Sequence, residues 1–226
     1  MRKILYLIFC VLFLVNINVS GQEKKTATKL YSPNDNFILF FNWDNWNDMP
    51  SNVETAGFRS RGFAFLFMND KQNSKGKLGF AYGFGMSSHN VHSNAFPGPD
   101  STGNKTELMV IPDSVKYDLN KLSLNYIDAA IEFRFHSPIG SKGKKFKISL
   151  GFKGGLLVQS HTKFKNKDDK IKTYDIDNLS SIQYGPTFRI GYSRVGISGY
   201  YGLSNVFKDN KGPDMTPYSV GIALTF

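Results

Sequence analysis

The last ten residues, from Pro217 to Phe226, constrain the fold of this chain more than any other stretch. Large apolar side chains occupy alternate positions there, at Tyr218, Val220, Ile222, Leu224 and Phe226. The positions between them hold small and uncharged residues, Ser219, Gly221, Ala223 and Thr225. A period of two indicates a β-strand. Because small side chains suit the crowded interior of a narrow closed barrel, the apolar face of this strand is expected to face lipid.

The same alternation recurs along the chain and predicts seven earlier strands. They span residues 37–46, 62–68, 77–89, 121–136, 146–159, 182–193 and 195–204. In the fourth of these ranges the parity of the apolar residues shifts once, between Tyr126 and Ile127. A shift of one residue is typical of a β-bulge, which we therefore predict at this position.

The predicted connections alternate between long and short. The long ones are 47–56, 90–120, 162–179 and 207–216, and the short ones are 69–76, 137–145 and 193–194. This alternation predicts an all-β fold, an eight-stranded antiparallel up-and-down transmembrane β-barrel over residues 37–226. An even strand count places both termini in the periplasm and the loops around Asn47, Asn90, Thr162 and Lys208 outside the cell. A soluble lipocalin-like barrel has the same period, but the minor face carries too little charge for a solvated exterior.

The N-terminal segment reads as an export signal. Arg2 and Lys3 precede an apolar run over residues 4–15, which is too short to span a membrane as a helix. Small residues then predict cleavage before Gln22, so that residues 1–21 form a cleaved signal peptide and residues 22–36 a flexible periplasmic lead-in. An uncleaved anchor is the alternative. The single cysteine, Cys10, lies in the signal, so a disulfide framework is excluded.

The net charge of +10 raises the question of an anionic partner. Export to the envelope argues against nucleic acid, and the lysines gather in predicted connections, at residues 141–147 and 163–172. The second cluster lies on the predicted outer side, where lipopolysaccharide phosphates are a possible contact and a solvated loop is the alternative.

Several charged residues fall on the predicted inward face of the barrel. They are Asp128, Glu132, Arg134, Lys147, Lys153 and Arg189. Because unpaired charges in a narrow lumen are costly, we expect them to form a structural network that holds the barrel shut. A small conductive or proton pathway is the alternative. No catalytic, cofactor-binding or metal-binding residue is predicted.

The histidines suggest the strongest enzymatic alternative. His89 and His92 follow Ser87 and Ser88 at the outer end of one predicted strand, and His161 follows Ser160 at the outer end of another. A lipid hydrolase or acyltransferase of the outer leaflet needs a serine activated by a histidine at this height. The spacing is not diagnostic, and a metal site at His89 and His92 is weaker still.

Several stretches resemble the PorT-like outer-membrane β-barrel family of the Bacteroidetes. They are the export signal followed by Gln22, residues 124–128 (LNYID), 151–156 (GFKGGL), 184–187 (YGPT) and the terminal Phe226. The resemblance implies an eight-stranded outer-membrane barrel, and some members are associated with type IX secretion and gliding. We therefore expect a monomeric, non-enzymatic structural or interaction protein without a cofactor, whose partners are membrane lipid, lipopolysaccharide and envelope or secretion-system proteins.

Overall fold

The structure is a computed structural model that describes residues 36–74, 76–138, 140 and 144–226. The predicted signal peptide and all but the last residue of the predicted lead-in lie outside the described residues. The secondary structure is almost entirely β. In chain order the elements are β1 (Phe37–Asn47), the 3-10 helix η1 (Gly57–Arg59), β2 (Arg61–Gln72), β3 (Leu78–His92), β4 (Ala95–Pro99), β5 (Thr106–Val110), β6 (Leu119–His136), β7 (Phe146–Lys165), β8 (Lys170–Tyr174), β9 (Ile182–Tyr192), β10 (Val195–Tyr201) and β11 (Thr216–Thr225). Among the described residues, no helix is long and apolar enough to cross a membrane.

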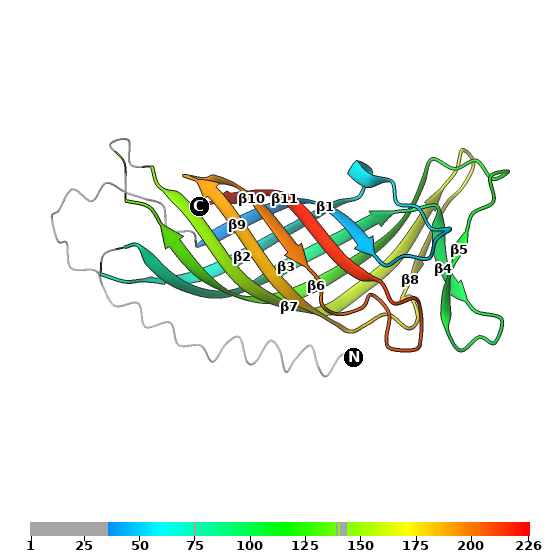
Figure 1. The fold of residues 1–226 in the computed structure, drawn as a ribbon. Coiled ribbons are helices and arrows are strands. Elements are labelled where there is room, and N and C mark those ends of the chain that lie inside the picture. Colours follow the sequence, from blue (N-terminus) through cyan, green and yellow to red (C-terminus); the bar gives the residue numbers. More distant parts are fainter. Residues whose placement is uncertain (1–35, 75, 139, 141–143) are drawn as a thin grey trace, which may run out of the picture. The chain divides into compact units, whose positions relative to one another are not determined.

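Eight of the strands close into a ring (Figure 1). Around the ring the order is β1, β2, β3, β6, β7, β9, β10 and β11, and every pairing is antiparallel. The first and last strands complete it, with Ile38 opposite Thr225 and Asn47 opposite Thr216. The predicted eight antiparallel strands are therefore confirmed. The other strands are additions: β4 and β5 form a separate hairpin, and β8 pairs with the far end of β7.

The two faces of the ring differ as the alternation predicted. Along β6, Asp128, Ala130 and Glu132 are buried inside the ring, whereas the intervening Ile131 and Phe133 are 46% and 57% exposed. Large apolar side chains are exposed in the same way on each of the eight ring strands. The structure thus points the large residues outward, opposite to the arrangement that a lipocalin-like barrel requires.

The prediction of a β-bulge within residues 121–136 is wrong, because the bulge lies on the neighbouring strand β7. Leu122, Leu124 and Tyr126 are buried on the same inner face as Asp128, so β6 keeps one parity throughout. The ladder between β6 and β7 does shift at this height, but the extra residue, Val158, belongs to β7. The sequence pattern changes because the apolar residues at this end of β6 pack into an internal cluster instead of facing outward.

The predicted long connections contain more strand than the sequence indicated. β3 continues to His92, β6 begins at Leu119, and β7 continues to Lys165, while β4, β5 and β8 lie wholly within predicted loops. These extensions project beyond the apolar band of the ring. Polar residues lie on their outward face, so no apolar alternation marks them as strands.

The four long connections meet at one end of the ring and form a single cap (Figure 1). Isolated bridges join Thr55 to Ser93 and Leu179 to Phe207, and the Thr106 amide donates to the Lys211 carbonyl. Beneath these contacts lies a buried apolar cluster. Its members are Trp46, Val53, Val91, Ala95, Leu108, Leu122, Leu124, Tyr126, Leu179, Val206, Phe207 and Met215. The cap is therefore an ordered structure with its own core.

Candidate functional site

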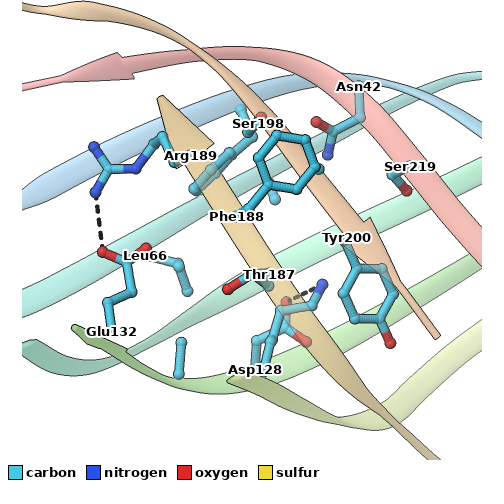
Figure 2. Close-up of a pocket in the computed structure, with 15 residues that line it drawn as sticks. Asn42, Leu66, Asp128, Glu132, Thr187, Phe188, Arg189, Ser198, Tyr200 and Ser219 are labelled. Carbon is cyan, nitrogen blue, oxygen red and sulfur yellow. Dashed lines mark hydrogen bonds and ion pairs between the residues drawn. The ribbon is translucent and has the colours of Figure 1, made fainter. Parts of the chain in front are cut away.

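The interior of the ring holds a charge network centred on Glu132. The carboxylate oxygen Oε2 of Glu132 accepts from Arg134 Nε at 2.8 Å and from Arg189 Nη2 at 2.9 Å; Figure 2 shows the second contact. Arg134 Nη1 also lies 3.2 Å from Asp70 Oδ2. All four side chains are buried, so each charge depends on its partners rather than on water.

A second ion pair lies nearer the cap. Lys153 Nζ is 3.4 Å from Asp128 Oδ2 and 4.4 Å from the centroid of the Tyr200 ring. Lys147 is also buried on the inner face of β7. The structure thus places all six predicted lumen residues inside the ring, where the ion pairs of Glu132 and Asp128 join five of them in two groups.

Asp70, which contacts Arg134, is not among the lumen residues that the sequence predicts. Residues 69–76 carry Asn, Lys, Gln and Gly, which predict a turn, whereas β2 continues to Gln72. Continuing the alternation of Gly62 to Met68 by one step would have placed Asp70 on the inner face.

A small cavity of about 40 Å³ lies between the charged wall and an apolar wall of the ring (Figure 2). Asp128, Glu132 and Arg189 line one side, and Phe40 and Leu66 line the other. A volume of this size holds on the order of one to three water molecules. The side chains therefore fill most of the interior at this height.

A further polar cluster lies just below the cap. His89 Nδ1 is 3.1 Å from Asp44 Oδ1, and Ser219 Oγ donates to the same carboxylate oxygen at 2.6 Å. Ser219 Oγ also lies 3.4 Å from His89 Nδ1, and Gln183 Nε2 lies 3.5 Å from His89 Nε2. In a serine hydrolase the serine and the aspartate contact opposite nitrogens of the imidazole. Here both contact Nδ1, so these residues lack the order that would activate the serine.

The serine and histidine pairs that the sequence suggested are not brought together. Among the described residues, no hydrogen bond joins Ser87, Ser88 or Ser160 to a histidine ring; Ser160 Oγ instead accepts from the Ile176 amide at 3.0 Å. His89 points into the ring and His92 lies on the opposite face of β3, so the two cannot share a metal ion. Nor does any group of three or more metal-binding side chains occur within the part of the chain that the structure describes.

The predicted outer lysine cluster lies on β7, β8 and the turn between them. Lys163 pairs with Lys172, and Lys165 pairs with Lys170. Desolvation and neighbouring cations lower the pKa of His161 and of Lys121, which lie beside these lysines in the projecting parts of their strands. Positive charge is therefore concentrated on this side of the cap.

The sequence profile of the outer membrane protein beta-barrel domain family matches residues 16–208. The chain belongs to this family. Among solved structures, it is similar to Ail, the attachment invasion locus protein of Yersinia pestis, crystallised with the heparin analogue sucrose octasulfate; the match has 12% identity and a TM-score of 0.33 and covers 84% of this chain and 96% of Ail. It is also similar to a triple mutant of the Rhodopseudomonas blastica porin, with 10% identity, a TM-score of 0.21, and coverage of 84% and 98%. No curated protein sequence matches the chain.

Family membership identifies the ring as an outer-membrane β-barrel domain and agrees with that part of the resemblance found in the sequence. The narrower PorT-like assignment stays a prediction.

Proposed function

We propose that this protein is a closed, up-and-down transmembrane barrel of the outer membrane that holds an ordered extracellular cap as a structural and interaction surface. The observation that carries the proposal is the combination of a filled, charge-paired lumen with four long connections joined into one cap. A barrel with this construction is suited to present a surface, and it is poorly suited to pass solutes.

The height of the apolar band supports a transmembrane placement. On β7 the regular alternation of outward apolar positions runs from Phe146 to Leu156, beyond which the bulge residue Val158 is exposed as well. Ten residues at about 3.3 Å each span about 33 Å along the strand, or about 25 Å in height at a tilt of about 40°. That height matches the lipid-facing band of outer-membrane barrels.

The orientation follows from the two ends of the ring. Phe37 and Phe226 exchange backbone hydrogen bonds of 2.8 and 3.1 Å at the end that carries the short turns. In outer-membrane barrels short turns face the periplasm and long loops face outward. We therefore place both termini in the periplasm and the cap outside the cell.

The proposed role does not require catalysis. The Asp44, His89 and Ser219 cluster lies inside the ring and lacks triad order, so we propose that it fixes β1, β3 and β11 to one another. An interaction role would suit a monomeric accessory of envelope assembly or secretion, as the PorT-like resemblance implies. Stable co-purification of secretion components with the tagged barrel would support that narrower role, and their absence under cross-linking would contradict it.

Two measurements test the broader proposal. The folded protein should fractionate with the outer membrane, and its gel mobility should shift on boiling. In planar lipid bilayers it should show no steady conductance above that of the lipid. A periplasmic, soluble protein without a heat shift would contradict the membrane placement, and regular open channels would contradict the closed lumen.

A further inference from the structure

A row of one histidine and three lysine side chains crosses four neighbouring strands where they project beyond the apolar band. His92 of β3 lies opposite Lys121 of β6, Lys121 lies opposite Lys163 of β7, and Lys163 lies opposite Lys172 of β8. Residues directly opposite in an antiparallel ladder share a face of the sheet. Since the flanking Asn120 and Leu122 are buried inside, all four side chains of this row lie on the outward face.

The row does not stabilise the sheet that carries it. Like charges on directly opposite residues destabilise a sheet. Across the described part of the chain, the ammonium groups of Lys121, Lys163 and Lys172 form no ion pair with a carboxylate, whereas Lys165 pairs with Asp118 at 3.2 Å. Lys121 Nζ donates instead to the neutral side-chain oxygen of Asn90, at 2.7 Å. The positive charge of the row is therefore left uncompensated.

An open groove of about 520 Å³ adjoins the row. Arg59, Arg61, His92 and Tyr117 contribute to its lining. Desolvation, together with the charges of Lys121, Arg59, Lys163 and Arg61, lowers the pKa of His92, which indicates that these cations converge on one place. The groove also contains Glu54 and Asp118, so it offers acceptors for sugar hydroxyls beside the donors for an anion.

The height of the row above the apolar band indicates which part of the outer leaflet lies beside it. The exposed apolar residue of β6 that lies nearest the cap is Ile127, six residues from Lys121. Six residues span about 20 Å along the strand, or about 15 Å in height at the usual tilt. The outward positions between them are polar, with Asn125 bonded to Gln159 at 2.8 Å. The row thus stands on the same outward face as the apolar band, at the level of the headgroups and the first sugars of the outer leaflet.

We propose that this row and its groove bind phosphate groups on the headgroups and inner sugars of outer-leaflet glycolipid. The inference rests on the proposed function, which places this end of the barrel outside the cell. A phosphorylated glycolipid matches the unpaired cations, the hydrogen-bonding groove and the continuity with the lipid-facing surface. An acidic protein would match the charge alone.

The test compares two matched triple variants of the mature barrel in phosphatidylcholine nanodiscs. K121Q/K163Q/K172Q removes the row, and K105Q/K116Q/K208Q removes the same charge from exposed positions elsewhere on the cap. The probe is purified rough lipopolysaccharide, offered with its phosphates intact or after chemical dephosphorylation. Because each basic residue near an anionic lipid surface is worth about 1 kcal/mol, removing the row should weaken binding of the intact probe by at least about tenfold. The control triple should change binding less than about twofold.

Several outcomes overturn the inference. Equal binding by the row variant and the wild type would do so, as would equal affinity of the wild type for the intact and dephosphorylated probes. Displacement of the intact probe by millimolar inorganic phosphate would assign the row to a free anion instead of a lipid. The two probes and a salt titration of the wild type keep the inference falsifiable even if the row variant does not fold, because phosphate binding by surface cations must weaken as salt increases.

Heat-dependent gel mobility of the same samples distinguishes a failure of this inference from a failure of the proposed function. A wild-type barrel that shifts on boiling but shows no preference for phosphate overturns the inference and leaves the proposed function standing. A wild-type chain that never inserts overturns both.

Discussion

Replacing Glu132 with glutamine should destabilise the barrel more than any other single neutralisation of a lumen carboxylate. Its Oε2 atom lies 2.8 Å from Arg134 Nε and 2.9 Å from Arg189 Nη2. The neutral amide keeps the shape of the side chain but removes the charge that holds two buried guanidinium groups together. Together with Asp70, Glu132 balances these two arginines, so the E132Q variant leaves one net positive charge in the group.

The magnitude follows from burial. Removing one partner of a buried ion pair costs about 3–5 kcal/mol, whereas an exposed pair is worth less than about 1 kcal/mol. The matched control is D118N, because the Asp118 and Lys165 side chains form an ion pair of similar length, 3.2 Å, but are 52% and 49% exposed. With an m-value of about 2 kcal/mol/M, E132Q should lower the urea midpoint by about 1.5–2.5 M. D118N should lower it by less than about 0.5 M.

Tryptophan fluorescence provides the assay. The chain has two tryptophans, and both lie on β1: Trp43 faces outward and Trp46 is buried beneath the cap. Reversible unfolding in urea from lipid vesicles, followed by fluorescence and by gel mobility, should give coincident transitions. In the double variant E132Q/R189Q the charge is balanced again, so its cost should fall at least about 1 kcal/mol short of the summed single costs. Equal midpoints for E132Q and D118N would refute the reasoning.

Three other predictions follow from the same structure. The G85V variant should fail to fold and show no heat-shifted band, because a Cβ at this position would overlap a backbone carbonyl oxygen of β2. Desolvation and neighbouring cations lower the pKa of both His92 and His161 in the folded state. Near and below pH 6.5, the ordinary pKa of histidine, the unfolded chain therefore binds more protons than the folded chain. The free energy of unfolding should therefore fall between pH 7 and pH 5, and H92Q/H161Q should reduce this pH dependence. The L150R variant, near the middle of the apolar band, should lose about 2–4 kcal/mol of stability in lipid vesicles but much less in a flexible detergent micelle.

The ring could be predicted from the sequence because the different surroundings of its two faces impose an alternation of large apolar and small residues on each strand. Phe80, Tyr82 and Phe84 alternate with small residues, since one face meets lipid and the other meets a crowded interior. The same parity identified inward charges such as Asp128 and Lys153. Local sequence alone is enough for both predictions.

The cap and the detailed pairing could not be predicted in the same way. The outer part of β7 carries polar side chains outward and belongs to an extension that leaves lipid, so its alternation has no apolar component. The contacts of Asp44 with His89 and Ser219 join residues that are 45 and 175 positions apart, which only the closed ring brings together. The cationic row likewise depends on the register of four strands, which a single bulge at Val158 helps to set.

The central claim is that the outward face of the ring lies in lipid while a filled, charge-paired interior closes it. The most direct measurement is a nitroxide scan of residues 147–156 on β7, made one cysteine at a time in a background in which Cys10 has been replaced or removed with the signal. In vesicles, power saturation by oxygen should peak at the outward positions Ile148, Leu150, Phe152 and Leu156, and a water-soluble nickel chelate should relax neither face strongly. Strong relaxation of the outward positions by the nickel chelate would show that this face is in water and would contradict the account; strong relaxation of the inward positions would show that the lumen is open.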